Sequence, residues 1–221
     1  MMKYDNKIKL SSDKRAMLNL ACGSKMNWDW NNIDFNYYAI LVKYKLIKSL
    51  LSRFNLISLS RQKKLNNIDP DIIKWNLRED LPFSDNKFDV IYNSHFLEHL
   101  QNNCTAIFLE ECYRVLKPGG ILRIVVPNLK SLIEHYVLTY KLITDGNEHL
   151  IKQHKENIEN IFEQFVRIDS GSLEERIGIL GFIESKILRR SVEKTGELHR
   201  WIYDQYTLTD LLSMVGFINI K

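Results

Sequence analysis

Near the start of the chain, a short apolar run stops at a turn of small residues, and this stretch constrains the fold more than any other. The run is Met17-Leu-Asn-Leu20, the turn is Ala21-Cys-Gly23, and Asp34 follows soon after. A strand that ends in small residues lets backbone approach a ligand closely, because no large side chain intervenes. An acidic residue at the end of the next strand can accept hydrogen bonds from ribose hydroxyls. The stretch therefore predicts an α/β sheet that binds a nucleoside.

Further along, apolar runs alternate with stretches of helical spacing. Helical spacing marks 104–116 and 207–215, and another extended run begins at Asp71. The other extended runs cover residues 17–21, 32–35, 88–93, 121–126 and 217–220. Strands that alternate with helices form a mainly parallel sheet with helices on both faces. The predicted fold is α/β, with a Rossmann-like mainly parallel sheet.

The stretch 104–116 shows the helical pattern in detail. Glu110 and Arg114 stand four residues apart and are expected to pair. Lys117-Pro-Gly-Gly120 ends the helix, because proline and glycine do not continue it. The buried stripe is expected to consist of Ile107, Phe108, Cys112, Val115 and Leu116.

Two long connections, at about 36–68 and 129–195, interrupt a chain that is predicted to form a single domain over residues 1–221. The first connection contains seven basic residues and no acidic one, whereas the whole chain has a formal net charge of only +4. The basic character is local and does not indicate a general nucleic-acid surface. Apolar residues between Ile40 and Phe54 recur at helical spacing. They indicate an amphipathic helix packed on the sheet or, alternatively, a lid, a partner site or a membrane-surface helix.

Composition excludes several classes of protein. Apolar residues make up 45% and charged residues 26% of the chain, which is ordinary for a globular protein. No run approaches the ~20 apolar residues that span a bilayer, and the first residues lack the pattern of a secretory signal. Cys22, Cys104 and Cys112 show neither metal-binding nor redox spacing. We therefore expect a cytoplasmic protein with reduced thiols.

Several blocks of the sequence have known counterparts. Leu18-Asn-Leu-Ala-Cys-Gly23 followed by Trp30-Asn-Asn-Ile-Asp34 resembles the first two motifs of class I S-adenosylmethionine-dependent methyltransferases. Leu81-Pro-Phe83 and the stretches 88–100 and 114–120 are similar to later blocks of the methyltransferase type 11 group. The resemblance implies S-adenosylmethionine as the cofactor and methyl transfer as the reaction.

The resemblance also implies which residues bind the cofactor. Asp34 would hold the ribose, and Asn76 with Leu77 would hold the adenine edge. Ala21 replaces the family's usual first glycine, and Asn76 replaces its usual aspartate, although an amide can still hydrogen-bond adenine. The whole expected set is Asn19, Ala21, Cys22, Gly23, Asp34, Asn76, Leu77, Asn93, Ser94 and His95.

Methyl transfer mainly requires that the acceptor is held in line with the sulfonium methyl group. A hydroxyl acceptor also needs a base. His95 and His199 are candidates, with Asp204 as an orienting residue, and either histidine could instead be structural. The stretch 199–204 followed by 211–217 resembles members from surface-glycan gene clusters. The implied acceptor is a small molecule or a glycan intermediate methylated on oxygen, and no nucleic-acid partner is expected.

Two other functions are open at this point. His95-Phe-Leu-Glu-His99 fits an inverted zinc-protease pattern, in which both histidines bind zinc from one helix and Glu98 acts as the base. A third ligand would then come from Glu134, Glu148 or Glu156. In the favoured interpretation there is no metal, and Glu98 and His99 serve capping and packing. The other alternative is a non-catalytic protein that binds S-adenosylmethionine as a scaffold.

The end of the sequence lacks a strand that the resemblance implies. The family's sheet has seven strands, and residues 217–220 form the predicted sixth, followed only by Lys221. Without its antiparallel neighbour, this strand would expose unpaired backbone groups. We expect a truncated sheet whose C-terminal edge frays or forms a homodimer. The alternatives are pairing onto the fifth strand, or a strand supplied by residues 1–15 or a partner chain.

Overall fold

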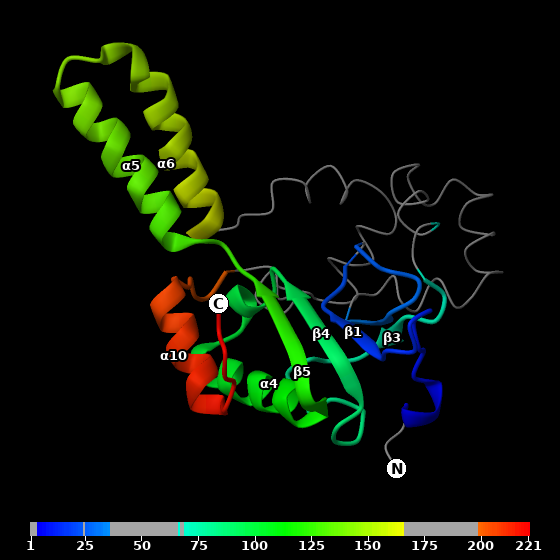
Figure 1. Ribbon diagram of the computed structural model, residues 1–221. Coiled ribbons are helices and arrows are strands. Elements are labelled where there is room, and N and C mark those ends of the chain that lie inside the picture. Colours follow the sequence, from blue (N-terminus) through cyan, green and yellow to red (C-terminus); the bar gives the residue numbers. More distant parts are fainter. Residues whose placement is uncertain (1–3, 24, 36–65, 67–68, 166–198) are drawn as a thin grey trace, which may run out of the picture.

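The computed structural model describes residues 4–23, 25–35, 66, 69–165 and 199–221. Within these residues, the centre is a five-stranded parallel sheet with the order β3-β2-β1-β4-β5 (Figure 1). The strands are β1 (Met17–Leu20), β2 (Asn31–Asp34), β3 (Ile73–Lys74), β4 (Phe88–Ser94) and β5 (Leu116–Val125). The strand order reverses beside β1, as in doubly wound sheets, which confirms the predicted Rossmann-like α/β fold.

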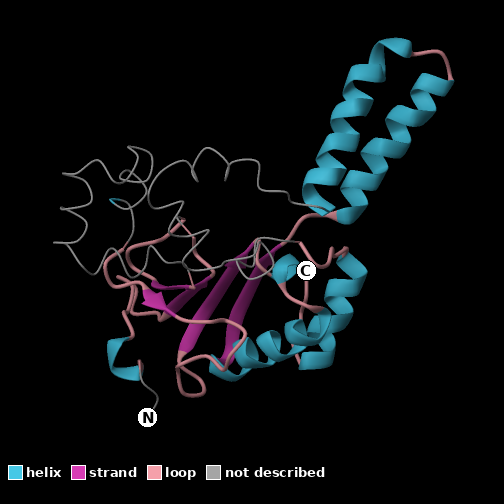
Figure 2. Cartoon of the chain, turned by 180° about the vertical axis from the view of Figure 1, so that it is seen from behind, coloured by secondary structure: helices cyan, strands magenta, loops and turns pink. Residues whose placement is uncertain are grey.

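Among the described residues, α4 and α10 pack beside the sheet, and α5 and α6 project from one end of it. Figure 1 shows α4 and α10 together near β5, and Figure 2 shows from behind how α5 and α6 extend away from the strands. The helix expected within 36–68 lies outside the described residues. The α-helices are α4 (Asn102–Val115), α5 (Leu129–Thr144), α6 (Ile151–Phe165) and α10 (Gln205–Val215), and the short 3₁₀ helices are η1 (Asp5–Lys7), η2 (Leu97–His99) and η3 (Glu148–Leu150).

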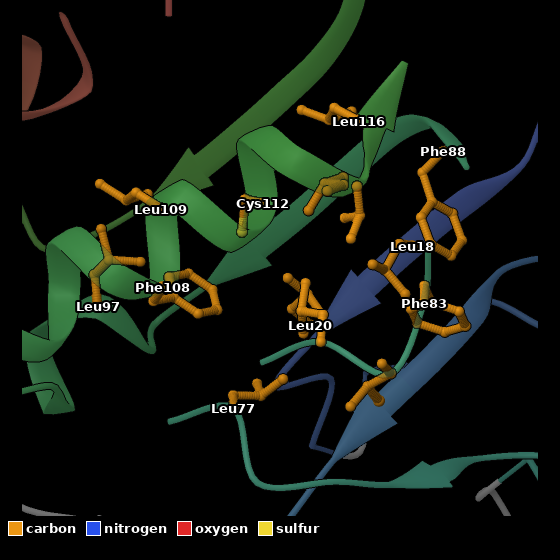
Figure 3. Close-up of a cluster of buried hydrophobic side chains, with 14 of the residues drawn as sticks. Leu18, Leu20, Leu77, Phe83, Phe88, Leu97, Phe108, Leu109, Cys112 and Leu116 are labelled. Carbon is orange, nitrogen blue, oxygen red and sulfur yellow. The ribbon is translucent and has the colours of Figure 1, made fainter. Parts of the chain in front are cut away.

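The hydrophobic core lies between α4 and the strands (Figure 3). Leu18, Leu20 and Ile91 of the central strands are fully buried, and Phe108 and Cys112 of α4 belong to the same cluster. Burial of one such side chain stabilises the folded state by about 1.5–3 kcal/mol. This cluster therefore fixes α4 against β1 and β4, and with them the carboxyl ends of the strands.

The stripe predicted for α4 is wrong at two positions, Ile107 and Leu116; Leu116 is buried as predicted, but it begins β5. Ile107 is 51% exposed, whereas Leu109 is fully buried. Successive residues lie about 100° apart around a helix, so Ile107 leaves the face that Phe108 and Leu109 share. The buried residues of the helix are Thr105, Phe108, Leu109, Cys112 and Val115.

Arg114, near the end of α4, ties the helix to the loop that precedes β4. Its guanidinium donates to Glu111 Oε1 at 2.7 Å, to Asp85 Oδ1 at 2.8 Å, and to the carbonyl oxygens of Leu81 and Phe83. The predicted pairing with Glu110 is wrong, because the acceptors of the loop lie on the Glu111 side of the helix. Burial alone would raise the pKa of Glu111, but hydrogen bonds from Arg114 and the Leu81 amide outweigh it and hold that pKa below its usual value.

Replacing Arg114 with methionine should lower the free energy of unfolding by about 2–4 kcal/mol at neutral pH. The change leaves the Glu111 carboxylate and two loop carbonyls without their shared donor. Lys130→Met is the control, because it removes only an exposed ion pair with Glu134 at 3.6 Å, and it should change the unfolding free energy by less than about 0.5 kcal/mol. Urea denaturation of the three proteins measures both effects.

The same comparison has a definite dependence on pH. A depressed carboxyl pKa gives stability that is present above the unfolded value of about 4.3 and is lost as the pH falls through the folded value. The difference in unfolding free energy between wild type and Arg114→Met should therefore shrink between about pH 7 and about pH 3. A difference that stays constant would contradict the assigned role of the Glu111–Arg114 pair.

A helical hairpin of α5, η3 and α6 occupies the first part of the predicted 129–195 insertion. Asn128 caps α5, because its side chain accepts a hydrogen bond from the Ser131 amide. The two long helices meet where the Thr139 hydroxyl lies 2.8 Å from His154 Nδ1. No described helix of the chain is both long enough and apolar enough to cross a membrane.

The sixth strand predicted at 217–220 is wrong, because these residues form no strand. Gly216 ends α10 with φ 111° and Asn219 has φ 55°, and these left-handed conformations break the extended run. Phe217 instead packs edge-on against Tyr113 of α4, with ring centroids 5.2 Å apart. Strand β5 is thus the edge of the described sheet. Association through this end of the chain stays a prediction.

The described part of the N-terminal arm does not supply a strand beside β5. The backbone amide of Lys9 donates to Asn31 Oδ1 at the start of β2, at 2.8 Å. The hydroxyl of Ser84 donates to Asp5 Oδ2 at 2.6 Å. The arm is therefore fixed near β2 and the loop before β4, so this alternative for the sheet edge is wrong for residues 4–15.

Candidate active site

The turn after β1 lies where three strands bring their carboxyl ends together. The register places Leu20 of β1 beside Ile33 of β2 and Asn93 of β4. The turn, Asp34 and Ser94 therefore occupy neighbouring positions at one edge of the sheet. Open α/β sheets bind ligands at this edge, beside the point where the strand order reverses.

Asp34, the residue predicted to hold the ribose, is hydrogen-bonded to the turn. Its Oδ2 accepts a hydrogen bond from the Gly23 amide at 2.7 Å. The Cys22 amide donates to the Ile33 carbonyl at 3.1 Å. These two hydrogen bonds hold the end of β2 against the small-residue turn, and the Asp34 carboxylate there is half buried.

Ala21 adopts a left-handed backbone conformation, which glycine adopts without strain. Its φ is 54°, and that of Gly23 is 53°. The left-handed conformation costs an L-residue about 1–2 kcal/mol. The alanine therefore stores strain in the turn.

Replacing Ala21 with glycine should raise the free energy of unfolding by about 1 kcal/mol, because glycine adopts this φ without strain but loses more entropy on folding. Ala106→Gly in α4 is the matched control. Its free energy of unfolding should fall by about 1 kcal/mol, because alanine is unstrained in a helix and glycine there only loses more entropy on folding. Urea denaturation measures the unfolding free energy of both variants and of wild type. Destabilisation of both variants by the same amount would contradict the strain at Ala21.

Two buried asparagines support the turn. Asn19 Nδ2 donates to the Lys25 carbonyl at 3.0 Å and to Asn32 Oδ1 at 3.1 Å. Asn93 Nδ2 donates to the Leu20 carbonyl at 3.1 Å. The Asn93 Oδ1 atom is buried and has no hydrogen-bond partner among the described residues. Buried polar atoms are rarely left unpaired, so this oxygen suits a donor group on a bound ligand.

Three other expected cofactor residues have their side chains engaged within the protein. Cys22 is buried, and burial raises the pKa of its thiol, which keeps the thiol protonated and unreactive. Asn76 donates to Glu79 Oε1 at 2.9 Å and accepts from the Arg78 amide at 3.2 Å. Leu77 belongs to the core. Its side chain is therefore packed inside the protein.

His95 directly follows β4 in a strained conformation. Its φ is 53°, and its amide donates to the Val125 carbonyl at 2.9 Å. Strain of this kind concentrates at functional sites. Nδ1 lies 3.1 Å from Oε1 of Glu98, with the histidine side chain half exposed and the glutamate fully buried. Since an ionised carboxylate can only accept, Nδ1 carries a hydrogen, and in the neutral ring Nε2 carries the lone pair.

The zinc-protease pattern requires His95 and His99 to lie on one α-helix, and this prediction is wrong. His95 lies outside η2, which is a single 3₁₀ turn over Leu97–His99. The two histidines therefore do not project from one α-helix at a spacing of four residues, and Glu98 contacts His95 directly. The pattern His95–His99 does not build that class of site.

His199 and Asp204 come from the segment before α10, and the structure does not join them. His199 Nδ1 donates to the Gln164 carbonyl, and its ring packs edge-on against His99, with centroids 4.7 Å apart. The Asp204 carboxylate accepts from the Thr207 amide at 2.8 Å as the cap of α10. Both residues line a cavity of about 410 Å³, and its wall also includes Leu129, Phe165, Trp201 and Ile202.

Sequence reasoning missed two features of this region. It took Glu98 as a capping residue or a hydrolytic base, whereas the structure makes it the partner of His95. Their spacing of three residues was a usable signal. It also missed that Glu98, His99 and His199 gather with ligand atoms within 4.8 Å of one another. No local pattern links His199 to the other two.

Comparison with known families agrees with the motifs. The family described as "Methyltransferase domain" matches residues 18–124. The match runs from β1 into β5. It includes the turn after β1, Asp34 and the His95–Glu98 pair.

Individual relatives are partial or distant. A Mycolicibacterium smegmatis protein named "Probable S-adenosylmethionine-dependent methyltransferase" is 45% identical over 58 residues, which are 26% of this chain and 21% of that protein. A SAM dependent methyltransferase from Archaeoglobus fulgidus is 16% identical with a TM-score of 0.43, over 93% of this chain and 62% of that one. PKMT2 from Rickettsia typhi is 15% identical with a TM-score of 0.45, over 95% of this chain and 40% of that one.

This chain thus spans about a fifth of the curated relative and less than two thirds of either solved structure. What carries the assignment is the matched family together with the sheet order and the motifs at its carboxyl edge. The match over residues 18–124, together with the motifs, supports a class I S-adenosylmethionine-dependent methyltransferase domain with S-adenosylmethionine as the cofactor.

Proposed function

We propose that this protein transfers a methyl group to a hydroxyl oxygen of a small-molecule or glycan acceptor, with His95 as the general base. The observation that carries the proposal is the contact between His95 and Glu98 at the carboxyl end of β4. That strand lies beside β1, whose turn and neighbouring Asp34 are expected to hold the cofactor. The base thus stands next to the place where the methyl group would be presented.

Bound S-adenosylmethionine would supply an electrophilic methyl group, so the residues need only position the acceptor and accept its proton. Glu98 holds the Nδ1–H of His95 and leaves the lone pair on Nε2. That nitrogen would take the hydroxyl proton as the bond between the acceptor oxygen and the methyl carbon forms and the carbon–sulfur bond breaks, which leaves the demethylated cofactor as a neutral thioether. The buried carboxylate stabilises the imidazolium that forms, in the manner of the acid in a catalytic triad.

The cavity beside His199 suits the acceptor. Phe165 and Trp201 contribute aromatic surface to its wall, and Arg200 and Asp204 contribute polar groups. Pockets for small ligands combine a mainly apolar lining with a few polar groups that fix orientation. Glu98 lies close to both His95 and the cavity. It contacts His95, and its carboxylate lies within 4.8 Å of a ring nitrogen of His199, which lines the cavity.

A screen of candidate acceptors tests methyl transfer. The protein is incubated with S-adenosylmethionine labelled in its methyl group and with a panel of sugars, glycan intermediates and hydroxylated metabolites. Mass spectrometry should find an acceptor that gains one labelled methyl group on oxygen. Tight cofactor binding with no transfer to any acceptor would favour the non-catalytic scaffold, and transfer to nitrogen would overturn the assignment of oxygen.

A further inference from the structure

We propose that Glu98, His99 and His199 form a binding site for a divalent metal ion, with Zn²⁺ as the best match. The ligand atoms of the three side chains lie within 4.8 Å of one another. Two imidazoles and one carboxylate form a ligand set that Zn²⁺ takes in proteins, and they leave a fourth position for water. The proposal concerns metal binding alone and does not depend on methyl transfer.

His199 has the tautomer that a metal ligand needs. Its Nδ1 donates to the backbone carbonyl of Gln164, so in the neutral ring Nε2 carries the lone pair. This Nε2 is buried and has no hydrogen-bond partner among the described residues. Histidines that bind metals almost always donate their other ring N–H to a carbonyl or carboxylate, which fixes the ring and its tautomer.

Glu98 supplies a second unused ligand atom. Its side chain is fully buried, and Oε1 lies 3.1 Å from His95 Nδ1. Oε2 is buried and has no partner among the described residues. A buried carboxylate oxygen left unpaired is unfavourable, and a cation bound there would remove the penalty. His95 would then orient the carboxylate from outside the site, as hydrogen-bonding neighbours of metal ligands do.

The backbone holds the two halves of the site together without a metal. The amides of Arg200 and Trp201 both donate to the carbonyl of Glu98, at 2.6 Å and 3.2 Å. His199 therefore stays next to η2, and its ring rests edge-on against that of His99 at 4.7 Å. The side chains are already close, so metal binding needs only small rotations to complete a tetrahedral site.

The competing explanation is a water molecule or a shared proton between Glu98 and His199. Metal titration of the full chain, stripped with a chelator, separates the two. Zn²⁺ is measured by competition with a chromogenic chelator, and Co²⁺ serves as a spectroscopic substitute. We expect one Zn²⁺ per chain and, with Co²⁺, the visible absorption of a tetrahedral site.

Two variants and a matched control locate the ion. Glu98→Gln keeps the shape of the side chain, and His199→Phe keeps a ring against His99, but both remove a ligand atom. Each should weaken Zn²⁺ binding by about 100-fold or more, since even outer-shell changes cost 10- to 100-fold. His149→Phe replaces an exposed histidine of η3, far from the cluster in the chain, and should leave affinity unchanged.

Thermal unfolding and circular dichroism show whether each variant is folded. Wild type should gain thermal stability with Zn²⁺, because an ion that binds only the folded state stabilises it by mass action. Zinc binding by wild type that is no tighter than in His199→Phe would overturn the proposal, as would a Co²⁺ spectrum that both variants retain. Since no methyl acceptor is used, failure here leaves the methyltransferase proposal untouched.

Discussion

Replacing Asp34 with alanine should weaken the binding of S-adenosylmethionine by about 100-fold or more. A carboxylate that accepts hydrogen bonds from two ribose hydroxyls contributes roughly 1.5–3 kcal/mol through each, and about 3 kcal/mol is already a factor above 100 in Kd. The variant also loses the contact from Oδ2 to the Gly23 amide, at 2.7 Å. Calorimetric titration with the cofactor and with its demethylated product gives the loss directly.

A second substitution separates the ribose contact from the support of the turn. Asp34→Asn keeps one oxygen for the Gly23 amide but loses the charge and one acceptor oxygen. If the ribose contacts dominate, the asparagine variant should bind nearly as weakly as the alanine variant; if support of the turn dominates, it should bind nearly as well as wild type. Asp29→Ala, an exposed carboxylate in the preceding loop, should bind normally. Unchanged affinity in a folded Asp34→Ala protein would remove Asp34 from the cofactor site.

The parts of the fold that the sequence predicted are those set by short-range chemistry. An apolar run that ends in Ala21-Cys-Gly23 must be a buried strand followed by a tight turn, and strand β1 is fully buried. The alternation of such runs with helical spacing then requires a parallel sheet. The position of Asp34 follows, because the carboxyl ends of neighbouring parallel strands share one edge. The strained φ of Ala21 shows that the strand and turn impose a backbone conformation that alanine alone disfavours.

The predictions from sequence were wrong where contacts between residues of different elements determine the structure. Apolar residues at 217–220 favour a strand, but left-handed conformations at Gly216 and Asn219 and the packing of Phe217 on Tyr113 prevent one. Arg114 prefers Glu111 to Glu110 because the loop at 81–85 supplies further acceptors on that side. The cluster of Glu98 with His199 joins segments far apart in the chain. Periodicity within one element carries no information about such contacts.

Replacing His95 with asparagine should lower kcat about 100- to 10,000-fold, the range that a positioned general base contributes. Asparagine tolerates the left-handed backbone that His95 adopts, with φ 53°, so the fold should persist while the basic nitrogen is lost. The affinity for S-adenosylmethionine should change little, because a base acts on the acceptor proton. Steady-state rates with an acceptor found by labelled-methyl screening, together with calorimetry of cofactor binding, measure the two quantities separately.

Chemical rescue tests the role of the imidazole itself. Glycine also accepts φ 53° without strain, and His95→Gly leaves space where the half-exposed ring stood. Added imidazole should restore part of the lost rate in this variant and should not accelerate wild type. The exposed His149, replaced by asparagine, should keep the wild-type rate. A His95→Asn enzyme with normal kcat, or a His95→Gly enzyme that loses activity and is indifferent to imidazole, would show that His95 shapes the end of β4 without accepting the proton.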